Sequence, residues 1–277
     1  LSEWAVARPD ETTLRPSERI PRVLDPACGS GTFTVETYNI LAGLYDESTH
    51  QQIVDALFAV DINRFPLHLT ALNLSSQKSD EETDHLNIFH DSFFNMDPET
   101  ERLINTKMDS TRESAEKIGK FDAVVGNPPY IRQGDLHPNK SHFRSHLSVF
   151  GRVGYSTYFD GSKELSGKSD AYVYFMTHAT QFLRNGGRLA FIVPNKWLTT
   201  RYGETLQEFL FDHYRLVGIV GFTARAFDDA LVDTVMVMLE RCEEESERRK
   251  QTIPFVRVRE TMDSEDIIDT VTVNYDT

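Results

Sequence analysis

Short apolar runs alternate along the chain with stretches whose apolar residues recur at helical spacing. The stretch through Phe33, Tyr38, Leu41 and Leu44 is an example of the helical spacing. This alternation predicts an α/β protein built on a mostly parallel sheet. Strands are expected at 23–25, 57–62, 87–90, 121–126, 188–194, 216–222 and 234–239. Helices are expected to start near 32 and 64 and to span 170–183 and 205–214, with a charged surface helix within 97–120.

The remaining segments complete this outline. Only a short gap separates the last two expected strands, which predicts a hairpin and therefore an antiparallel strand at 234–239. Residues 1–20 are polar and rich in proline, which indicates a loop or a frayed segment. We interpret residues 1–241 as one domain. Residues 242–277 are then a linker and the start of a following β-containing segment.

The strand expected at 121–126 leads directly into Asn127-Pro128-Pro129-Tyr130. Two consecutive prolines fix φ and remove two N–H donors, so the chain must leave the sheet here. An amide, carbonyl groups without ladder partners and an aromatic ring are therefore held at the carboxyl end of a strand. Open α/β sheets bind their ligands at that end.

A glycine turn joins the first strand to the first helix. Small residues in such a turn let the backbone approach a ligand, and the helix N-terminus offers free N–H groups. This layout favours a nucleotide-like cofactor. Cys28 is interpreted as a packing residue, because no neighbour would lower the pKa of its thiol. The turn reads Asp25-Pro26-Ala27-Cys28-Gly29-Ser30-Gly31-Thr32-Phe33.

Acidic residues follow the second and third expected strands. Asp61, followed by Ile62, occupies the position that holds a ribose diol in nucleotide-binding sheets, and a cap role for the next helix is the less favoured alternative. Asp91 is followed by Ser92 and Phe93. An acid there would accept a hydrogen bond from the exocyclic amine of an adenine while a ring packs on the base, and a helix-cap role for Asp91 is the alternative.

Taken together and in this order, the glycine turn and the Asn-Pro-Pro-Tyr motif resemble those of the γ-class N6-adenine DNA methyltransferases. These are the TaqI-like and type IIG restriction-modification enzymes, and the resemblance covers about residues 21–241. It implies a class I methyltransferase fold with seven strands in the order 3-2-1-4-5-7-6. It also implies S-adenosylmethionine as cofactor and methyl transfer to N6 of an adenine flipped out of double-stranded DNA.

The resemblance also assigns roles to individual residues. Cofactor binding is assigned to Asp25, Pro26, Ala27, Gly29, Gly31, Thr32, Phe33, Asp61, Ile62, Asp91, Ser92, Phe93 and Asn127. Catalysis is assigned to Asn127, Pro128, Pro129 and Tyr130, with Phe227 as the second wall around the base and Phe222 as the runner-up.

Charge changes the picture of how DNA would be bound. The chain has 43 acidic and 29 basic residues, a formal net charge of -14, whereas a DNA-binding surface is expected to be basic. Either a target-recognition domain or specificity subunit outside these residues supplies the basic surface, or the surface is salt-adapted, as in a halophilic archaeon. Residues 131–168 reverse the local charge, and we expect them to contact DNA, unless they are merely a solvated loop. The expected DNA-binding residues are Arg132, Lys140, Arg144, Arg152 and Lys196.

We expect a cytoplasmic protein, and the resemblance implies a prokaryotic one. No apolar run approaches the ~20 residues of a membrane span, and no signal peptide opens the chain. Cys28 and Cys242 do not form a disulfide framework. Because the chain starts at Leu1, we expect it to be a piece of a longer protein. The resemblance implies that this longer protein could also include a fused nuclease.

Two other functions remain open at this point. Methyltransferases that act on protein glutamine or on RNA share Asn-Pro-Pro-Tyr. A non-catalytic methyltransferase-like module is the second alternative, because the Tyr-Thr-Pro segment that usually precedes the glycine turn in the family is not found in residues 1–20.

Overall fold

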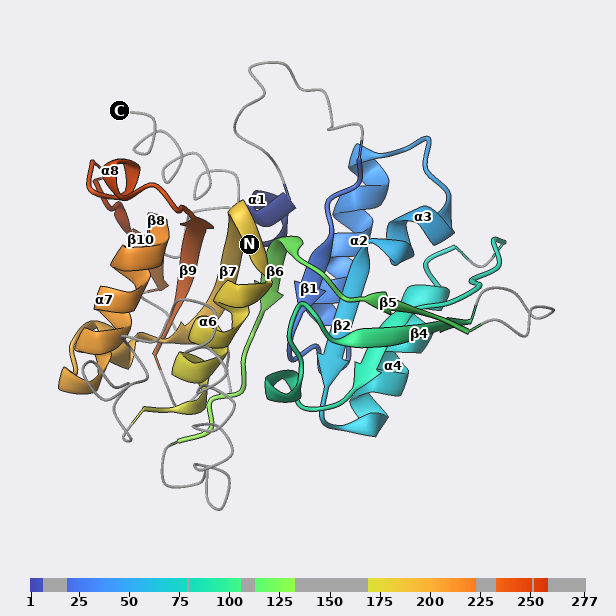
Figure 1. Ribbon diagram of the computed structural model, residues 1–277, viewed down its shortest axis with the longest axis horizontal. Helices are drawn as coiled ribbons and strands as arrows, with labels where there is room; N and C mark the ends of the chain where they lie inside the picture. Colours follow the sequence, from blue (N-terminus) through green and yellow to red (C-terminus); the bar gives the residue numbers. More distant parts are fainter. Residues whose placement is uncertain are drawn as a thin grey trace. The chain divides into compact units, whose positions relative to one another are not determined.

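A computed structural model of the 277-residue chain describes residues 1–6, 19–78, 80–105, 113–132, 169–222, 233–250 and 252–258. These residues fall into two compact units (Figure 1). The N-terminal unit comprises Ser2–Gly126 with Gln181–Arg184, and the C-terminal unit comprises Asn127–Thr180 with Asn185–Thr277. No helix in the described ranges is long and apolar enough to cross a membrane.

The N-terminal unit contains a parallel sheet whose strands are ordered β6-β1-β2-β3, as predicted for this part of the fold. All residues of β1 and β6 are buried, as expected for strands covered on both faces. The parallel strands end together at one edge, which therefore carries the predicted ligand-binding turns. The strands are β1 (Val23–Asp25), β2 (Leu57–Asp61), β3 (Asn87–His90) and β6 (Phe121–Gly126). The helices are α1 (Ser2–Val6), α2 (Thr32–Leu44), α3 (His50–Asp55), α4 (Arg64–Ser75) and the 3-10 helix η1 (Phe93–Asn95).

Two predictions for this unit were wrong. Residues 2–6 form α1 rather than a loop, because Trp4, Ala5 and Val6 become buried where the helix contacts α2 and β6. The stretch 97–120 contains an antiparallel hairpin of β4 (Glu101–Asn105) and β5 (Glu113–Lys117) instead of a helix.

Two backbone hydrogen bonds close the base of the hairpin. The N–H of Ile118 donates to the carbonyl of Thr100 at 2.9 Å, and that of Gly119 donates to the carbonyl of Pro98 at 2.8 Å. Gly119 has φ +73, a left-handed conformation that glycine adopts readily. These bonds join residues about twenty positions apart in the chain, so the charged composition of the stretch gives no local signal of the hairpin.

The C-terminal unit contains strands ordered β10-β8-β9-β7. Strand β9 runs antiparallel to both of its neighbours, so the predicted hairpin is confirmed. Strand β10 lies parallel to β8, and it extends the predicted set of seven strands to eight. The strands are β7 (Leu183–Pro194, with its first two residues in the N-terminal unit), β8 (Tyr214–Phe222), β9 (Thr234–Arg241) and β10 (Phe255–Val258). The helices are α6 (Ala171–Phe182), η4 (Asn195–Leu198), η5 (Arg201–Gly203), α7 (Glu204–His213) and α8 (Glu245–Arg248).

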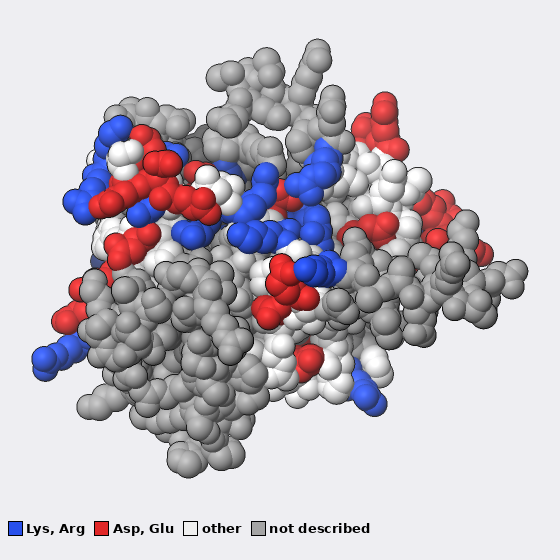
Figure 2. Space-filling model, viewed as in Figure 1, with Lys and Arg blue, Asp and Glu red and all other residues white. Residues whose placement is uncertain are grey.

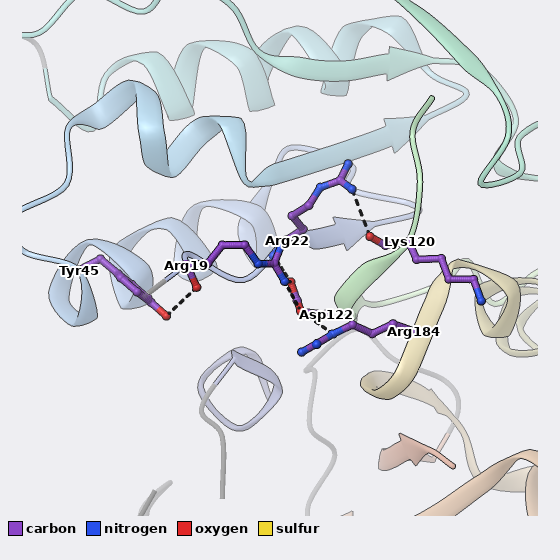
Figure 3. Close-up of polar contacts among 6 residues, drawn as sticks. All are labelled: Arg19, Arg22, Tyr45, Lys120, Asp122 and Arg184. Carbon is purple, nitrogen blue, oxygen red and sulfur yellow. Dashed lines mark hydrogen bonds and ion pairs between the residues drawn. The ribbon is translucent and has the colours of Figure 1, made fainter. Parts of the chain in front are cut away.

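A buried carboxylate fixes the entry into β1. Asp122, the second residue of β6, accepts hydrogen bonds from Arg19 at 2.8 and 2.9 Å and from the backbone N–H of Arg22 at 2.7 Å. Its Oδ1 also pairs with Arg184 Nε at 2.6 Å (Figure 3). Figure 2 shows blue Lys and Arg surface around the start of β6. Asp122 therefore joins the segment before β1 to the central strand of the unit.

Replacing Asp122 by Ala should lower the free energy of unfolding by about 2 kcal/mol, since charged hydrogen bonds contribute ~1.5–3 kcal/mol each. The expected loss lies at the low end of what the lost bonds allow, because Arg19 is mostly exposed and Arg184 is partly exposed, so both regain water. Urea denaturation monitored by circular dichroism measures the change. Asp122→Asn retains an acceptor for the Arg22 N–H and should lose less. Equal stability of the Ala variant and the unmutated chain would show that these bonds are not stabilising.

Candidate active site

The glycine turn leaves β1 and enters α2 with a tightly closed backbone. The N–H of Cys28 donates to Val60 O at 3.0 Å, and that of Gly31 donates to Cys28 O at 2.8 Å. Gly29 and Gly31 have φ +53 and +90, so both occupy the left-handed region. Gly31 is also the N-cap of α2 and supplies no side chain to its first turn. The N–H groups of that turn are consequently available to a ligand with a carboxylate or another acceptor.

Asp61 is tied to this turn. Its Oδ2 accepts from the N–H of Gly29 at 2.9 Å, and its Oδ1 accepts from the N–H of Asn63 at 2.7 Å. The N-cap residue of α4 is Asn63. The carboxylate of Asp61 accepts from the N–H of Asn63 and not from an N–H of the first helical turn, so Asp61 is not the N-cap of α4. Each carboxylate oxygen has a second acceptor site, and the side chain is partly exposed. Asp61 can therefore hold the turn and still accept hydrogen bonds from a diol.

Asp25 at the end of β1 is almost fully buried. Its carboxylate accepts from Thr34 Oγ1 at 3.1 Å and from the N–H of Ala27 at 3.3 Å. Burial raises the pKa of Asp25 to about 7, against the opposing effect of these two hydrogen bonds, and the nearby charge of Asp61 raises it further. An acid of this kind is ready to lose its proton when a cation arrives beside it.

Gly126, the last residue of β6, lies against the same carboxylate. A Cβ placed on Gly126 would stand 2.9 Å from Asp25 Oδ1, so a side chain there would collide with the acid. The ends of β1 and β6 are thus neighbours in the N-terminal unit, as their parallel pairing requires. The Asn-Pro-Pro-Tyr motif starts at the next residue of the chain.

Within the motif, two polar atoms are buried without a partner among the described residues: Asn127 Oδ1 and the Tyr130 hydroxyl. A buried acceptor of this kind costs free energy unless a ligand donates to it. Burial raises the pKa of Tyr130 to about 12, against the opposing effect of the neighbouring Asn127 side chain, so its phenol is neutral at physiological pH. The two groups are neighbours, but neither makes a hydrogen bond of good geometry with the other. Pro128 is buried, and Pro129 and Tyr130 are partly exposed.

Asp91 and Phe93, which were predicted to contact an adenine, make contacts within the protein. Asp91 is exposed, and its Oδ1 accepts from the N–H of Ser92 and from Asn95 Nδ2, both at 2.7 Å. This favours a local turn role, although the carboxylate retains acceptor sites. Phe93 is only 2% exposed and packs on Phe182 with the ring centroids 5.1 Å apart. Its ring is part of the core in this structure, so it has no open face for an adenine.

The remaining predicted residues differ in how far they are exposed. Pro26 is buried, Ala27 and Phe33 are partly buried, and Thr32 and Ile62 are exposed. Arg132 and Lys196 are exposed, as phosphate-contacting residues must be. Lys140, Arg144, Arg152, Phe227 and residues 133–168 as a whole lie outside the described residues, and so does the side chain of Phe222.

Sequence reasoning missed the residues that hold the turn from behind. Thr70 and Asn73 of α4 donate to the carbonyls of Gly29 and Ser30, at 2.9 and 3.1 Å. A helical threonine gives no sequence signal of such a contact, because its partner lies about forty residues away. Cys28 packs with Ala59 and Leu67, and burial raises the pKa of its thiol to about 12, as expected for a packing residue.

The sequence is similar to those of restriction-modification methyltransferases. The family model of the Eco57I restriction-modification methylases matches residues 55–227. The type II methyltransferase M.BstVI of Geobacillus stearothermophilus is 33% identical over 109 residues, which are 39% of this chain and 17% of that protein. The adenine-specific methyltransferase PglX of Streptomyces coelicolor is 24% identical over 234 residues, which are 69% of this chain and 18% of that protein. The chain thus spans less than a fifth of the length of either relative.

The fold has a close counterpart among solved structures. A Listeria monocytogenes protein assigned to the class I S-adenosylmethionine-dependent methyltransferases matches with a TM-score of 0.60 and 17% identity. The match covers 91% of this chain and 64% of that one. The predicted class I methyltransferase fold is therefore confirmed.

Proposed function

Because the chain belongs to the Eco57I restriction-modification methylase family, we propose that it is the catalytic part of a DNA methyltransferase specific for the N6 amine of adenine. The observation that carries the proposal is the Asn127 side-chain oxygen, buried without a partner among the described residues and placed directly after β6. The name of the relative PglX, an adenine-specific methyltransferase, supports the choice of base.

The residues around the glycine turn fit S-adenosylmethionine. This cofactor carries a sulfonium, an ammonium, a carboxylate and a ribose diol. The first turn of α2 offers N–H groups to the carboxylate, Asp25 offers a buried acid to the cationic end, and Asp61 offers acceptor sites to the diol. When bound, S-adenosylmethionine supplies a methyl group that its sulfonium has already activated.

The role of the motif follows from the chemistry of the acceptor nitrogen. The lone pair of an adenine N6 is delocalised into the ring, so the amine is a poor nucleophile. The Asn127 oxygen and the Pro128 carbonyl would each accept one N6–H, which draws the nitrogen towards tetrahedral geometry. The same acceptors stabilise the positive charge that develops on the nitrogen during transfer. Positioning for in-line attack supplies most of the remaining acceleration.

Tyr130 would hold the ring of the base. Because the target adenine is stacked inside a duplex, it must be flipped out before its amine reaches the site. Stacking on an aromatic ring contributes ~1–3 kcal/mol per base and compensates for part of the lost stacking in DNA. We propose Phe227 as the opposite wall, with Phe222 as the second candidate.

The partners we propose are double-stranded DNA and a target-recognition domain or specificity subunit beyond these residues. The net charge of -14 supports this, since DNA binding requires a basic surface. Residues 131–168 remain our candidate for phosphate contacts, and Arg132 and Lys196 are exposed. A fused nuclease is a further candidate, in keeping with the restriction-modification family.

Transfer of a tritiated methyl group to DNA, RNA and protein, measured side by side, tests the function. We expect label in DNA and its recovery as N6-methyladenine after digestion to nucleosides. A longer protein that includes a recognition domain is the appropriate enzyme, because we propose that the recognition surface lies outside these residues. Label found only in protein glutamine or only in RNA would replace our proposal by one of the alternatives.

Asp61→Ala should weaken S-adenosylmethionine binding by roughly 1.5–3 kcal/mol, the contribution of a charged hydrogen bond. Two losses would act together: the diol loses its acceptor, and the N–H of Gly29 loses the partner that orients the turn. Isothermal titration calorimetry measures the affinity. Asp55→Asn, an exposed acid at the end of α3, is the matched control and should bind normally. Normal binding by Asp61→Ala would remove Asp61 from the site.

A further inference from the structure

We infer that Thr70 is a positioning residue for the glycine turn. It holds residues 28–31 of this turn in the conformation that binds the cofactor, and it contacts them from the side opposite the ligand. The inference deepens the proposed function and rests on it for the identity of the ligand. Thr70 lies in α4 and has no exposed surface, so it acts on the turn and does not touch solvent.

The contact is a hydrogen bond to a backbone group of the turn. Thr70 Oγ1 donates to the carbonyl of Gly29 at 2.9 Å. The same hydroxyl is 3.4 Å from Pro66 O and 3.7 Å from Cys28 Sγ, so the Gly29 carbonyl is its nearest acceptor. A hydroxyl has one proton to donate, and the shortest geometry indicates where it goes.

Gly29 is therefore held at both ends of its own backbone. Its N–H donates to Asp61, and its carbonyl accepts from Thr70. A left-handed glycine is otherwise the most mobile residue a chain can contain, because it has the widest choice of φ and ψ. Two side-chain bonds to one glycine remove that choice before any ligand binds.

A second residue of α4 supports the first. Asn73 lies three positions after Thr70, on the same side of the helix, and its Nδ2 donates to the carbonyl of Ser30 at 3.1 Å. The turn also has no room for a side chain on this side. A Cβ on Gly31 would lie 2.9 Å from both Cγ2 and Oγ1 of Thr70. The shape and the hydroxyl of Thr70 thus both match the turn.

The direction of these bonds has a consequence for binding. Because the carbonyls of Gly29 and Ser30 are engaged by α4, they are directed away from a ligand that approaches the N-terminus of α2. An incoming carboxylate then meets N–H groups and not carbonyl oxygens. Preorganisation of this kind raises affinity because the turn loses little conformational entropy on binding.

The test compares Thr70→Val, which keeps the shape and removes the hydroxyl, with Thr70→Ser, which keeps the hydroxyl. Thr177→Val is the matched control, because Thr177 is also fully buried in a helix and, among the described residues, donates to carbonyls of that same helix. We expect the dissociation constant for S-adenosylhomocysteine, measured by calorimetry, to rise about ten-fold in Thr70→Val. It should change less than two-fold in Thr70→Ser and in the control. In the longer enzyme, KM for S-adenosylmethionine should rise while kcat at saturation stays within two-fold.

A readout without ligand separates this inference from the proposed function. Hydrogen exchange of the peptide that covers the turn should be at least ten-fold faster in cofactor-free Thr70→Val than in Thr70→Ser or Thr177→Val. If the turn exchanges at the same rate in all variants, the inference is wrong whatever the chain binds. If exchange changes as expected but the unmutated longer protein binds no cofactor, Thr70 still orders the turn and the proposed function fails instead.

Discussion

Asn127→Ala is expected to reduce methyl transfer by at least 10²–10³-fold, the loss found when one group that stabilises a transition-state charge is removed. The Asn127 oxygen would interact most strongly with N6 as positive charge develops, so its removal affects kcat more than substrate binding. Affinity for S-adenosylmethionine should stay within a few-fold of normal. Single-turnover kinetics on a duplex that contains the recognition sequence measures the chemical step directly.

Asn185→Ala is a suitable control, because Asn185 is exposed and lies after α6, away from the motif in sequence. It should retain full activity and lose the modest stabilisation of the hydrogen bond that Asn185 Oδ1 accepts from the N–H of Glu243 at 3.0 Å. A similar fall in both variants would indicate damage to the fold. Undiminished methylation by Asn127→Ala would contradict the mechanism, and the Pro128 carbonyl alone would then have to activate the amine.

Between about pH 4 and pH 7, the free energy of unfolding of the cofactor-free chain should fall as pH rises. Burial gives Asp25 a folded-state pKa of about 7, against the ordinary value of 3.8. In that window the folded chain therefore holds a proton that the unfolded chain has lost, so raising the pH favours unfolding. The full contribution is on the order of 4 kcal/mol, since one pKa unit corresponds to ~1.4 kcal/mol. Above pH 7 this contribution no longer changes.

Urea denaturation at a series of pH values measures this slope. Asp25→Asn should remove it, while Asp46→Asn, at an exposed acid after α2, should leave it in place. Binding of a cationic cofactor should also release a proton from Asp25 near neutral pH, which calorimetry in buffers of different ionisation enthalpy detects. An identical pH profile in Asp25→Asn and the unmutated chain would show that Asp25 is ionised in the folded state.

Much of this molecule could be predicted from local patterns. Strand β6 carries apolar residues such as Val124 on both of its faces, which identifies it as a buried strand. The glycine turn and the prolines of Asn-Pro-Pro-Tyr mark where strands end. The hairpin at 97–120 was mispredicted because its stabilising contacts join Pro98 with Gly119, about twenty residues apart. The short helix α1 was missed because five residues give no reliable periodicity.

The site was predicted in part, for the same physical reason. Asp25 and Asp61 are recognisable because each ends a strand, and that position brings them to the glycine turn. The burial of Asp25 and the core position of Phe93 could not be predicted, because both depend on packing between distant parts of the chain. Thr70 could not be found, since a threonine in a helix usually bonds its own helix and only the packing of α4 on the turn redirects it.

The hold of α4 on residues 28–31 also bears on how fast the cofactor binds. A turn that must fold around its ligand slows association, whereas a turn already in place leaves diffusion and orientation as the main barriers. Stopped-flow measurements with the unmutated chain should therefore show an observed rate that increases linearly with cofactor concentration. In Thr70→Val the rate should level off at high concentration, because closure of the turn becomes the limiting step. Cofactor exchange between successive turnovers would then depend on dissociation alone as long as α4 keeps the turn closed.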